Sequence, residues 1–194
     1  MSIKTLVRNC EYTDVMCDLE TLGKHPGCSI LSIGAVAFDR QSSDMDNAST
    51  FYIVLDRKSC RRAGLVEEED TVKWWMAQEP AARSVLDEAE HKGLIIGEAL
   101  TQFSRWFRGV GSPNMWGNSP DFDMSILAAA YRNMSRNVPW DFWKVRCFRT
   151  IRDINEHAAV RGVGRMERSG TYHNALDDAM TQARYAQKIL RGLA

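Results

Sequence analysis

The chain has 194 residues, 44% hydrophobic and 26% charged, which predicts one domain over residues 1–194 with a substantial core. No apolar run approaches the roughly 20 residues of a membrane span, and no signal-peptide hydrophobic region opens the sequence, so we expect a cytoplasmic protein without a membrane partner. The five cysteines are odd in number and never spaced as Cys-x-x-Cys, which argues against a disulfide framework and a zinc site.

Charge is balanced overall but unevenly spread. Twenty-five Lys and Arg residues face twenty-five Asp and Glu residues. Residues 131–168 carry nine basic against four acidic side chains, which leaves sixteen against twenty-one elsewhere. Such a division suits an enzyme that acts on a polyanion, although a solvated basic face explains the charge equally well.

The first 55 residues predict an antiparallel meander of three strands. An apolar run over 15–17 leads into the first strand, whose end is marked by Thr21-Leu22-Gly23. A largely buried strand follows over 29–38, and a third over 50–55, with polar connections between them.

Helical patterns dominate the rest of the chain. They predict helices over residues 67–76, from Pro80, and over 95–107, 121–134, 150–159 and 174–190, with a strand end at 115–118 and a Gly/Arg-rich loop at 160–170. Strands first and helices interleaved later predict a mixed α/β sheet with helices on both faces.

Two acids lie at the end of the first strand. Asp18 and Glu20 are two residues apart, so an extended chain places both carboxylates on one face. Adjacent like charges on a part-buried strand repel each other and lose solvation unless a cation neutralises them. Oxygen ligands of this kind suit Mg²⁺ or Mn²⁺, but most Asp-x-Glu pairs at strand ends are solvated turn residues.

Three further residues raise the probability of a metal site. Asp123 and Asp178 each lie near the start of a predicted helix, where acids are also common for dipole reasons alone. His173 precedes Asp178 by five positions. Together with Asp18 and Glu20, these residues give the order Asp-x-Glu, Phe-Asp and His-x-x-x-x-Asp.

In this arrangement the sequence resembles the histidine-containing branch (DEDDh) of the DEDD exonuclease superfamily, alongside proofreading exonucleases and ribonuclease T. Within it, the chain looks closest to the phage and bacterial exonuclease VIII-like proteins and small 3′-5′ exoribonucleases. The resemblance covers most of the chain, through blocks in the family order: Asp18-Leu19-Glu20-Thr21-Leu22-Gly23-Lys24, Ser32-Ile33-Gly34-Ala35-Val36, Thr71-Val72-Lys73-Trp74-Trp75, Trp116-Gly117-Asn118, Arg149-Thr150-Ile151 and His173-Asn174-Ala175-Leu176-Asp177-Asp178-Ala179.

The resemblance implies a ribonuclease H-like fold, with a mixed five-stranded sheet whose second strand is antiparallel to the rest. It also implies a 3′-5′ exonuclease that uses two Mg²⁺ ions, with Mn²⁺ as a substitute. Asp18 would bridge the ions, Glu20 and Asp178 would complete the site of the attacking water, and Asp123 would support the second ion. His173 would be the general base, since an imidazole is neutral near its ordinary pKa of about 6.5.

Two positions have competitors. Three residues separate Asn118 from the Phe-Asp pair, where proofreading enzymes usually have two, and this brings Asp121 into competition with Asp123. Asp123 is preferred because it follows the Phe and directly precedes a helical run. Asp177 competes with Asp178, and the five-residue step from His173 favours Asp178.

The same resemblance implies that a single-stranded DNA or RNA 3′ end, or a 3′ overhang, is the substrate. Thr21, Leu22 and Gly23 would lie against the terminal nucleotide, with Leu22 packing on a base, and Asn118 would assist. A nucleic-acid end-binding module with little turnover and an internally cutting ribonuclease H-like nuclease are the alternatives. The sugar preference stays open, and relatives suggest a homodimer.

The sequence gives weaker indications of residues that would contact the nucleic acid away from its 3′ end. Trp74 and Trp75 are neighbours on a predicted helix, so at most one can face a given surface, and core packing is expected for at least one. Arg146, Arg149 and Arg165 are candidates for contacts with backbone phosphates.

Overall fold

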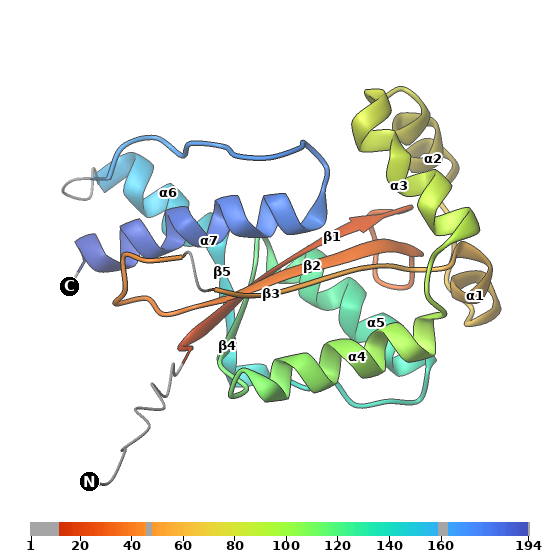
Figure 1. The fold of residues 1–194 in the computed structure, drawn as a ribbon, viewed down its shortest axis with the longest axis horizontal. Coiled ribbons are helices and arrows are strands. Elements are labelled where there is room, and N and C mark those ends of the chain that lie inside the picture. The colour runs from red at the N-terminus through yellow and green to blue at the C-terminus, as the bar shows by residue number, and fades with distance from the viewer. Residues whose placement is uncertain (1–11, 46–47, 159–162, 194) are drawn as a thin grey trace, which may run out of the picture.

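A five-stranded mixed sheet in the order β3-β2-β1-β4-β5 forms the centre of the molecule (Figure 1). The structure, a computed structural model, describes residues 12–45, 48–158 and 163–193. The strands are β1 (Asp14–Thr21), β2 (Ile30–Phe38), β3 (Ser49–Val54), β4 (Asn114–Gly117) and β5 (Val145–Cys147).

The pairing confirms the predicted meander and sheet. β2 is antiparallel to β1, from the pair of Asp14 with Phe38 to the pair of Glu20 with Ser32, and β3 is antiparallel to β2. β4 pairs parallel to β1, and β5 pairs parallel to β4. The second strand therefore runs opposite to the other four.

The helices follow the predicted order, with additions. They are α1 (Arg57–Arg62), α2 (Glu69–Met76), α3 (Pro80–His91), α4 (Ile96–Gly109), α5 (Ser125–Asn133), α6 (Phe148–Ala158) and α7 (Ala175–Gly192), with a π-helical turn η1 (Pro120–Met124) and a 3-10 turn η2 (Phe142–Lys144). None of the helices within the described ranges is long and apolar enough to cross a membrane. The predictions for residues 159 and 160–162 lie outside the described residues.

The short elements α1 and β5 were among those missing from the sequence prediction. α1 spans six residues, too few for a clear apolar period, and is started by the Asp56 side chain, which accepts a hydrogen bond of 2.6 Å from the Ser59 amide. β5 spans three residues within a basic, aromatic segment. Such short elements are fixed by their neighbours rather than by their own pattern.

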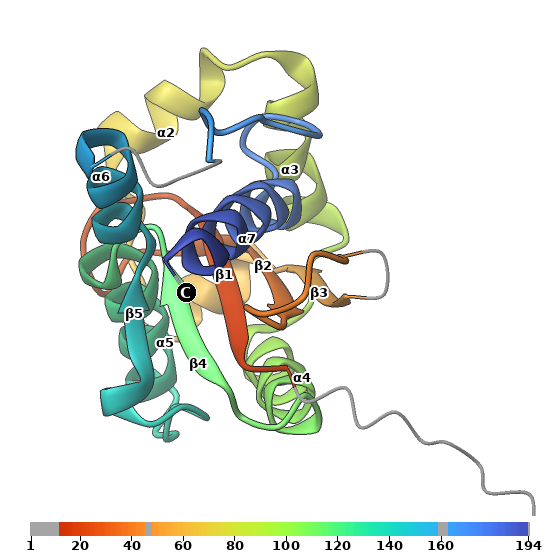
Figure 2. The same cartoon turned by 90° about the vertical axis from the view of Figure 1, so that its left-hand side faces the viewer.

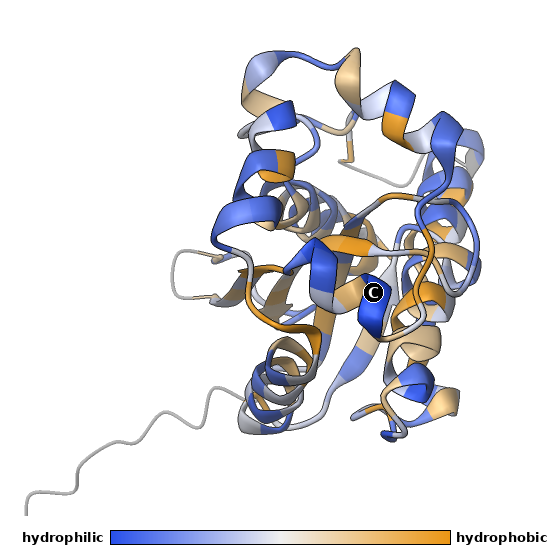
Figure 3. Ribbon diagram, turned by 90° about the vertical axis from the view of Figure 1, so that its right-hand side faces the viewer, coloured by the Kyte–Doolittle hydropathy of each residue, from blue (hydrophilic) through white to orange (hydrophobic). Residues whose placement is uncertain are grey.

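Helices cover both faces of the sheet, as predicted. Alternate β1 residues Val15, Cys17 and Leu19 belong to one core cluster with α4 and α5, whereas Met16 belongs to a second cluster with α7. Figure 2 shows α7 on one side of the strands and α4 on the other. The strands are coloured mostly as hydrophobic residues in Figure 3, while the surrounding helices carry both colours. The period of two in β1 therefore divides the core into two layers.

A third core cluster closes the end of the sheet where β1 ends. Leu22 and Leu31 pack there with Trp75 of α2 and with the apolar side of α3. On the α7 face, Gly34 of β2 permits the start of α7 to approach, because a Cβ at this position would lie 2.1 Å from the Ala175 carbonyl carbon. The end of β1 thus meets α2 and the start of α7, and these elements frame a pocket.

Candidate active site

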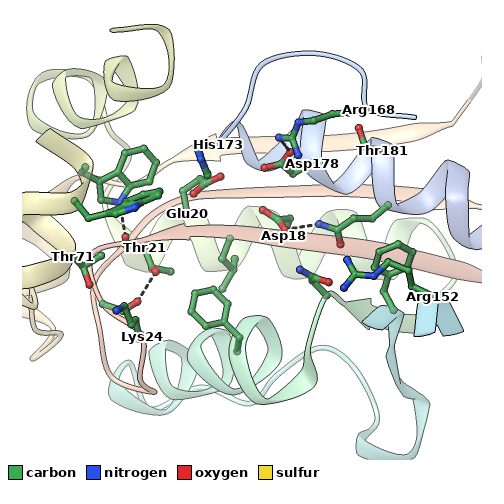
Figure 4. A pocket seen from close by; sticks show the side chains of 18 of the residues that line it. Asp18, Glu20, Thr21, Lys24, Thr71, Arg152, Arg168, His173, Asp178 and Thr181 are labelled. Carbon is green, nitrogen blue, oxygen red and sulfur yellow. Dashed lines mark hydrogen bonds and ion pairs between the residues drawn. The ribbon is translucent and has the colours of Figure 1, made fainter. Parts of the chain in front are cut away.

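A pocket of about 600 Å³ lies at the end of β1. Its walls come from β1, α2, the β4–η1 segment, and the C-terminal part of the chain from α6 to α7. Figure 4 shows Asp18 and Glu20 of β1 on the side of the strand that faces His173 and Asp178. The predicted common face of the two β1 carboxylates is therefore present.

Asp18 has a single hydrogen-bond donor among the described side chains. Gln182 of α7 donates from Nε2 to Asp18 Oδ1 at 2.8 Å. Glu20 is only 7% exposed. A carboxylate in such surroundings has lost most of its water without gaining full compensation from the protein.

The extra residue before Asp123 is accommodated by η1. This π-helical turn turns the Asp123 side chain inward, where the residue is 1% exposed, and leaves Asp121 exposed. Asp123 packs against Gly117, where a Cβ would lie 2.9 Å from Asp123 Oδ2. The geometry favours the choice of Asp123 over Asp121.

The start of α7 positions Asp178 and His173. Asn174 caps the helix, since its side chain accepts hydrogen bonds from the amides of residues 176 and 177 at 3.1 and 3.2 Å. Asp177 turns away and accepts a hydrogen bond of 2.7 Å from the Thr171 amide. Asp178 lines the pocket, so the geometry favours it over Asp177.

His173 is held in an uncommon backbone conformation. Its φ of 61° lies in the left-handed region, which few residues other than glycine adopt. The imidazole meets the Trp74 ring edge-to-face, with centroids 5.0 Å apart, and the Trp75 ring at 6.0 Å. These two rings define the orientation of the imidazole within the pocket.

Three of the predicted residues can share one ion. Glu20, His173 and Asp178 each offer a ligand atom, and these atoms all lie within 4.8 Å of one another. Asp18 and Asp123 are outside this trio, although Asp123 lies close enough for its charge to raise the pKa of both Asp18 and Glu20.

Burial disfavours the charged form of all four carboxylates, and neighbouring carboxylates add to this effect at Asp18 and Glu20. Burial raises the pKa of Asp18 well above its ordinary range, and the charges of the other three carboxylates raise it further. Burial, followed by the charges of Asp178 and Asp123, raises the pKa of Glu20 to about 8. Burial also raises the pKa of Asp123 to about 7 and raises that of Asp178, although Arg168 opposes the latter change. A bound cation would relieve this repulsion.

Arg168 is a cation that the structure places against this group. Its Nη2 donates to Asp178 Oδ1, and its Cζ lies 3.7 Å from the centroid of the Tyr172 ring. The side chain therefore reaches the pocket from the loop before α7, supported by an aromatic face.

The pocket also fits a ligand with polar groups. Buried polar atoms without a partner cost free energy and usually mark a missing water or ion. Four such side-chain atoms among the described residues belong to residues that line this pocket: Thr71 Oγ1, Asn118 Oδ1, Arg168 Nε and Gln182 Oε1. The oxygen atoms of this set, with the carboxylates of Asp18, Glu20 and Asp178, fit a divalent cation that keeps part of its water shell.

The residues predicted to contact the terminal nucleotide do not all lie in the pocket. Thr21, Gly23 and Asn118 line the pocket. Leu22 does not, because its side chain is fully buried in the cluster with Trp75, and the expected packing of Leu22 on a base is wrong for this structure. The apolar Leu22 side chain therefore packs in the core and does not contact a base.

Several pocket residues escaped the sequence analysis. Gln182 lies four positions after Asp178, a spacing that places both on one helical face and could have revealed it. Arg152 of α6 and Arg168 also line the pocket, but no motif or spacing in the sequence around them indicates this. Of the adjacent tryptophans, Trp74 is 45% exposed at the pocket, while its neighbour is buried, as expected for at least one of them.

Solved structures share this fold at low sequence identity. The nuclease domain of 3′hExo, a DEDDh family member bound to rAMP, is 11% identical, with a TM-score of 0.58 over 94% of this chain and 94% of that chain. Pop2p of S. pombe, in a form with Mg²⁺ and Mn²⁺ bound, is 13% identical, with a TM-score of 0.58 over 93% and 85%. A 3′-exonuclease, in a structure that describes its 3′-end-specific recognition of a histone mRNA stem-loop, is 12% identical, with a TM-score of 0.55 over 93% of this chain and 83% of that chain. The likeness confirms the ribonuclease H-like fold.

The sequence itself identifies the family. A comparison with curated proteins gives no match. The model of the Rv2179c-like 3′-5′ exoribonuclease domain matches residues 13–190, which is most of the chain. The chain therefore belongs to the Rv2179c-like family of 3′-5′ exoribonuclease domains and is a 3′-5′ exonuclease.

Proposed function

We propose that this exonuclease depends on divalent metal ions and shortens single-stranded nucleic acid, or a 3′ overhang, from the 3′ end, releasing nucleoside monophosphates. One observation carries the proposal. Asp18, Glu20 and Asp178 line one pocket beside His173, burial raises the pKa of these three carboxylates and of Asp123, and the charge of Asp123 raises the pKa of Asp18 and Glu20 further.

Asp18, Glu20, Asp123 and Asp178 would hold two Mg²⁺ ions, with Mn²⁺ as a substitute. When bound, such ions supply a nucleophilic water at neutral pH and neutralise charge on the attacked phosphate and the leaving oxygen. The shared fold of Pop2p, solved with Mg²⁺ and Mn²⁺, supports the choice of ions.

His173 is the proposed general base. The imidazole lies among Glu20 and Asp178 ligand atoms, and two tryptophan rings restrict its orientation. A base held beside the reacting water can accept its proton without a search through rotamers, which lowers the entropic cost of the step.

The 3′ end of the nucleic acid would meet the side of the pocket formed by Thr21 and Gly23. The Thr21 hydroxyl donates to the Gly23 carbonyl at 2.7 Å, and the Thr21 carbonyl accepts from Trp75 Nε1 at 2.8 Å, so this turn is fixed in place. Asn118 completes this substrate side of the pocket. The exposed face of Trp74 is available for stacking against the terminal base.

RNA is the proposed substrate. The matching family is described as an exoribonuclease domain, and the similar structures include one bound to rAMP and one that recognises a histone mRNA stem-loop. We further propose that the chain forms a single exonuclease domain over residues 1–194, located in the cytoplasm and able to form a homodimer. The one continuous sheet of the described residues supports the single domain.

The test uses end-labelled single-stranded RNA and DNA of matched sequence. We expect stepwise shortening from the 3′ end with Mg²⁺ or Mn²⁺, faster on RNA, and none with chelator or in an Asp18→Ala variant. Shortening that persists in the variant would show that the carboxylates are not the site. Cleavage of a circular strand would instead indicate an internally cutting nuclease, and binding without cleavage would indicate an end-binding module.

A further inference from the structure

Two large aromatic side chains are exposed together on η2, just before β5. Phe142 is 82% exposed and Trp143 is 62% exposed. Their ring centroids lie 4.9 Å apart at an interplanar angle of 84°. Single exposed apolar side chains are common, but a pair of neighbouring aromatic rings offers a surface that gains free energy when a partner covers it.

This aromatic pair is held in place from both sides. Lys144 donates from Nζ to the Ser112 carbonyl at 3.0 Å, which attaches η2 to the loop before β4. Arg146 donates from Nη1 to the Trp143 carbonyl at 2.7 Å. The two rings are thus presented by a fixed turn, and their exposure does not come from a free chain end.

Unneutralised cations lie along the same segment. Arg146 donates only to backbone carbonyl oxygens, and Arg149, which is exposed, has no ion pair within the described part of the chain. Aromatic faces next to arginine side chains are the combination that binds single-stranded nucleic acid without sequence preference. An anionic strand fits this surface better than an apolar protein partner, which would leave these charges buried and unpaired.

The segment leads directly to the pocket. Figure 2 shows β5 leading into α6, and Phe148 and Arg152 of α6 line the pocket. The Arg149 amide donates to the carbonyl of Asn118, another pocket residue, at 3.2 Å. Even if fully extended, at about 3.3 Å per residue, the five steps from Trp143 to Phe148 would span at most about 16 Å.

We propose that Phe142 and Trp143 form a stacking platform for bases of the substrate on the 5′ side of the nucleotide being removed. Arg146 and Arg149 contact the backbone phosphates between this platform and the pocket. The inference rests on the proposed function, since the occupant is the same single strand whose 3′ end lies in the pocket. It predicts that long substrates bind more tightly than short ones through residues far from the reacting phosphate.

The test compares a dinucleotide with a single strand of about 12 nucleotides, within the usual site sizes of single-strand binding proteins. The variant is Phe142→Ala with Trp143→Ala. We expect its KM for the long strand to rise roughly 10-fold or more, because loss of one base stack by alanine substitution commonly has an effect of this size. Its kcat/KM for the dinucleotide should stay within about twofold of the wild type, a change that is small beside any lost stack.

Matched variants separate stacking from general surface effects. Ile95→Ala removes another exposed apolar side chain, 53% exposed, at the start of α4, and should leave both substrates unaffected. Trp143→Phe keeps an aromatic face, so this variant should retain most of the affinity for the long strand that the double variant loses. Arg149→Gln should reduce the slope of log affinity against log salt concentration by about 0.7, the value for one phosphate contact on a single strand.

Three results would overturn the platform. The first is an unchanged KM for the long strand in the double variant, and the second is an equal loss on the dinucleotide. The third is a wild-type dimer that becomes monomeric in the double variant, measured by sedimentation, which would assign the aromatic pair to an interface between copies. Failure of the proposed function is distinct, because the wild-type protein would then shorten neither substrate.

Discussion

Two carboxylates on the same face of β1 have opposite surroundings. Asp14 is fully buried and accepts hydrogen bonds from Arg40 Nε and Nη2 at 2.8 and 2.6 Å and from Trp116 Nε1 at 2.7 Å. Asp18, four residues later, accepts one hydrogen bond, from Gln182, and is surrounded by other carboxylates.

The difference separates a structural acid from a candidate ligand. A buried carboxylate that is ringed by donors stabilises the fold around it. A carboxylate among other carboxylates instead destabilises the metal-free fold and leaves its lone pairs available to a cation. Residue type and strand face are shared by Asp14 and Asp18, so neither property alone identifies a metal site.

Replacing His173 should strongly slow turnover without removing the metal ligands of the site. We expect His173→Ala to lower kcat roughly 10²–10⁴-fold, the usual contribution of a general base, while Mg²⁺ still binds. The measurement is single-turnover cleavage of end-labelled RNA beside a calorimetric metal titration. Turnover that equals the wild type would mean that another group accepts the proton.

The same substitution at the two β1 acids should give opposite changes in stability. Asp14→Asn should lower the free energy of unfolding by about 3 kcal/mol, the lower end for a broken buried pair, because the Arg40 side chain is one-third exposed. Asp18→Asn should raise the unfolding free energy of the metal-free protein, because it removes repulsion, while abolishing activity. Urea unfolding in chelator measures both.

A loss of stability in both variants would contradict the distinction between the two acids. Activity per folded molecule provides the control, since Asp14→Asn should retain it.

The hydrogen bond from Gln182 should affect metal affinity. Gln182→Met should weaken Mg²⁺ or Mn²⁺ binding about 10–100-fold, the usual result of losing a group that orients a ligand. Gln187→Met is the matched control, because Gln187 is equally buried on α7 but donates to the Asp39 carbonyl at 2.8 Å, away from the pocket. Equal metal affinities in the two variants would remove Gln182 from the site.

The stability of the metal-free protein should also depend on pH. The folded protein holds protons on Glu20 up to about pH 8 and on Asp123 up to about pH 7, above ordinary values of 4.5 and 3.8. Their contribution is therefore complete below the ordinary values and is lost as pH rises toward 7–8. In chelator, Tm should fall over this window, and saturating Mg²⁺ should reduce the fall. A flat Tm in chelator would argue against the repulsion.

The sequence alone determined the meander, the alternation of β1 and the family resemblance. Two-residue periodicity assigns each β1 side chain to a face, so the common face of Asp18 and Glu20 follows from local geometry. The longer helices were predictable for the same reason, since each carries its own apolar stripe.

Tertiary structure decided which side chains meet. Leu22 and Trp74 are both apolar, yet Leu22 is buried in the core and Trp74 is partly exposed at the pocket, because α2 packs against the end of β1. The partnership of Gln182 with Asp18 joins positions 164 residues apart. Local sequence specifies the face on which a residue lies, whereas contacts between distant segments depend on how the helices close over the sheet.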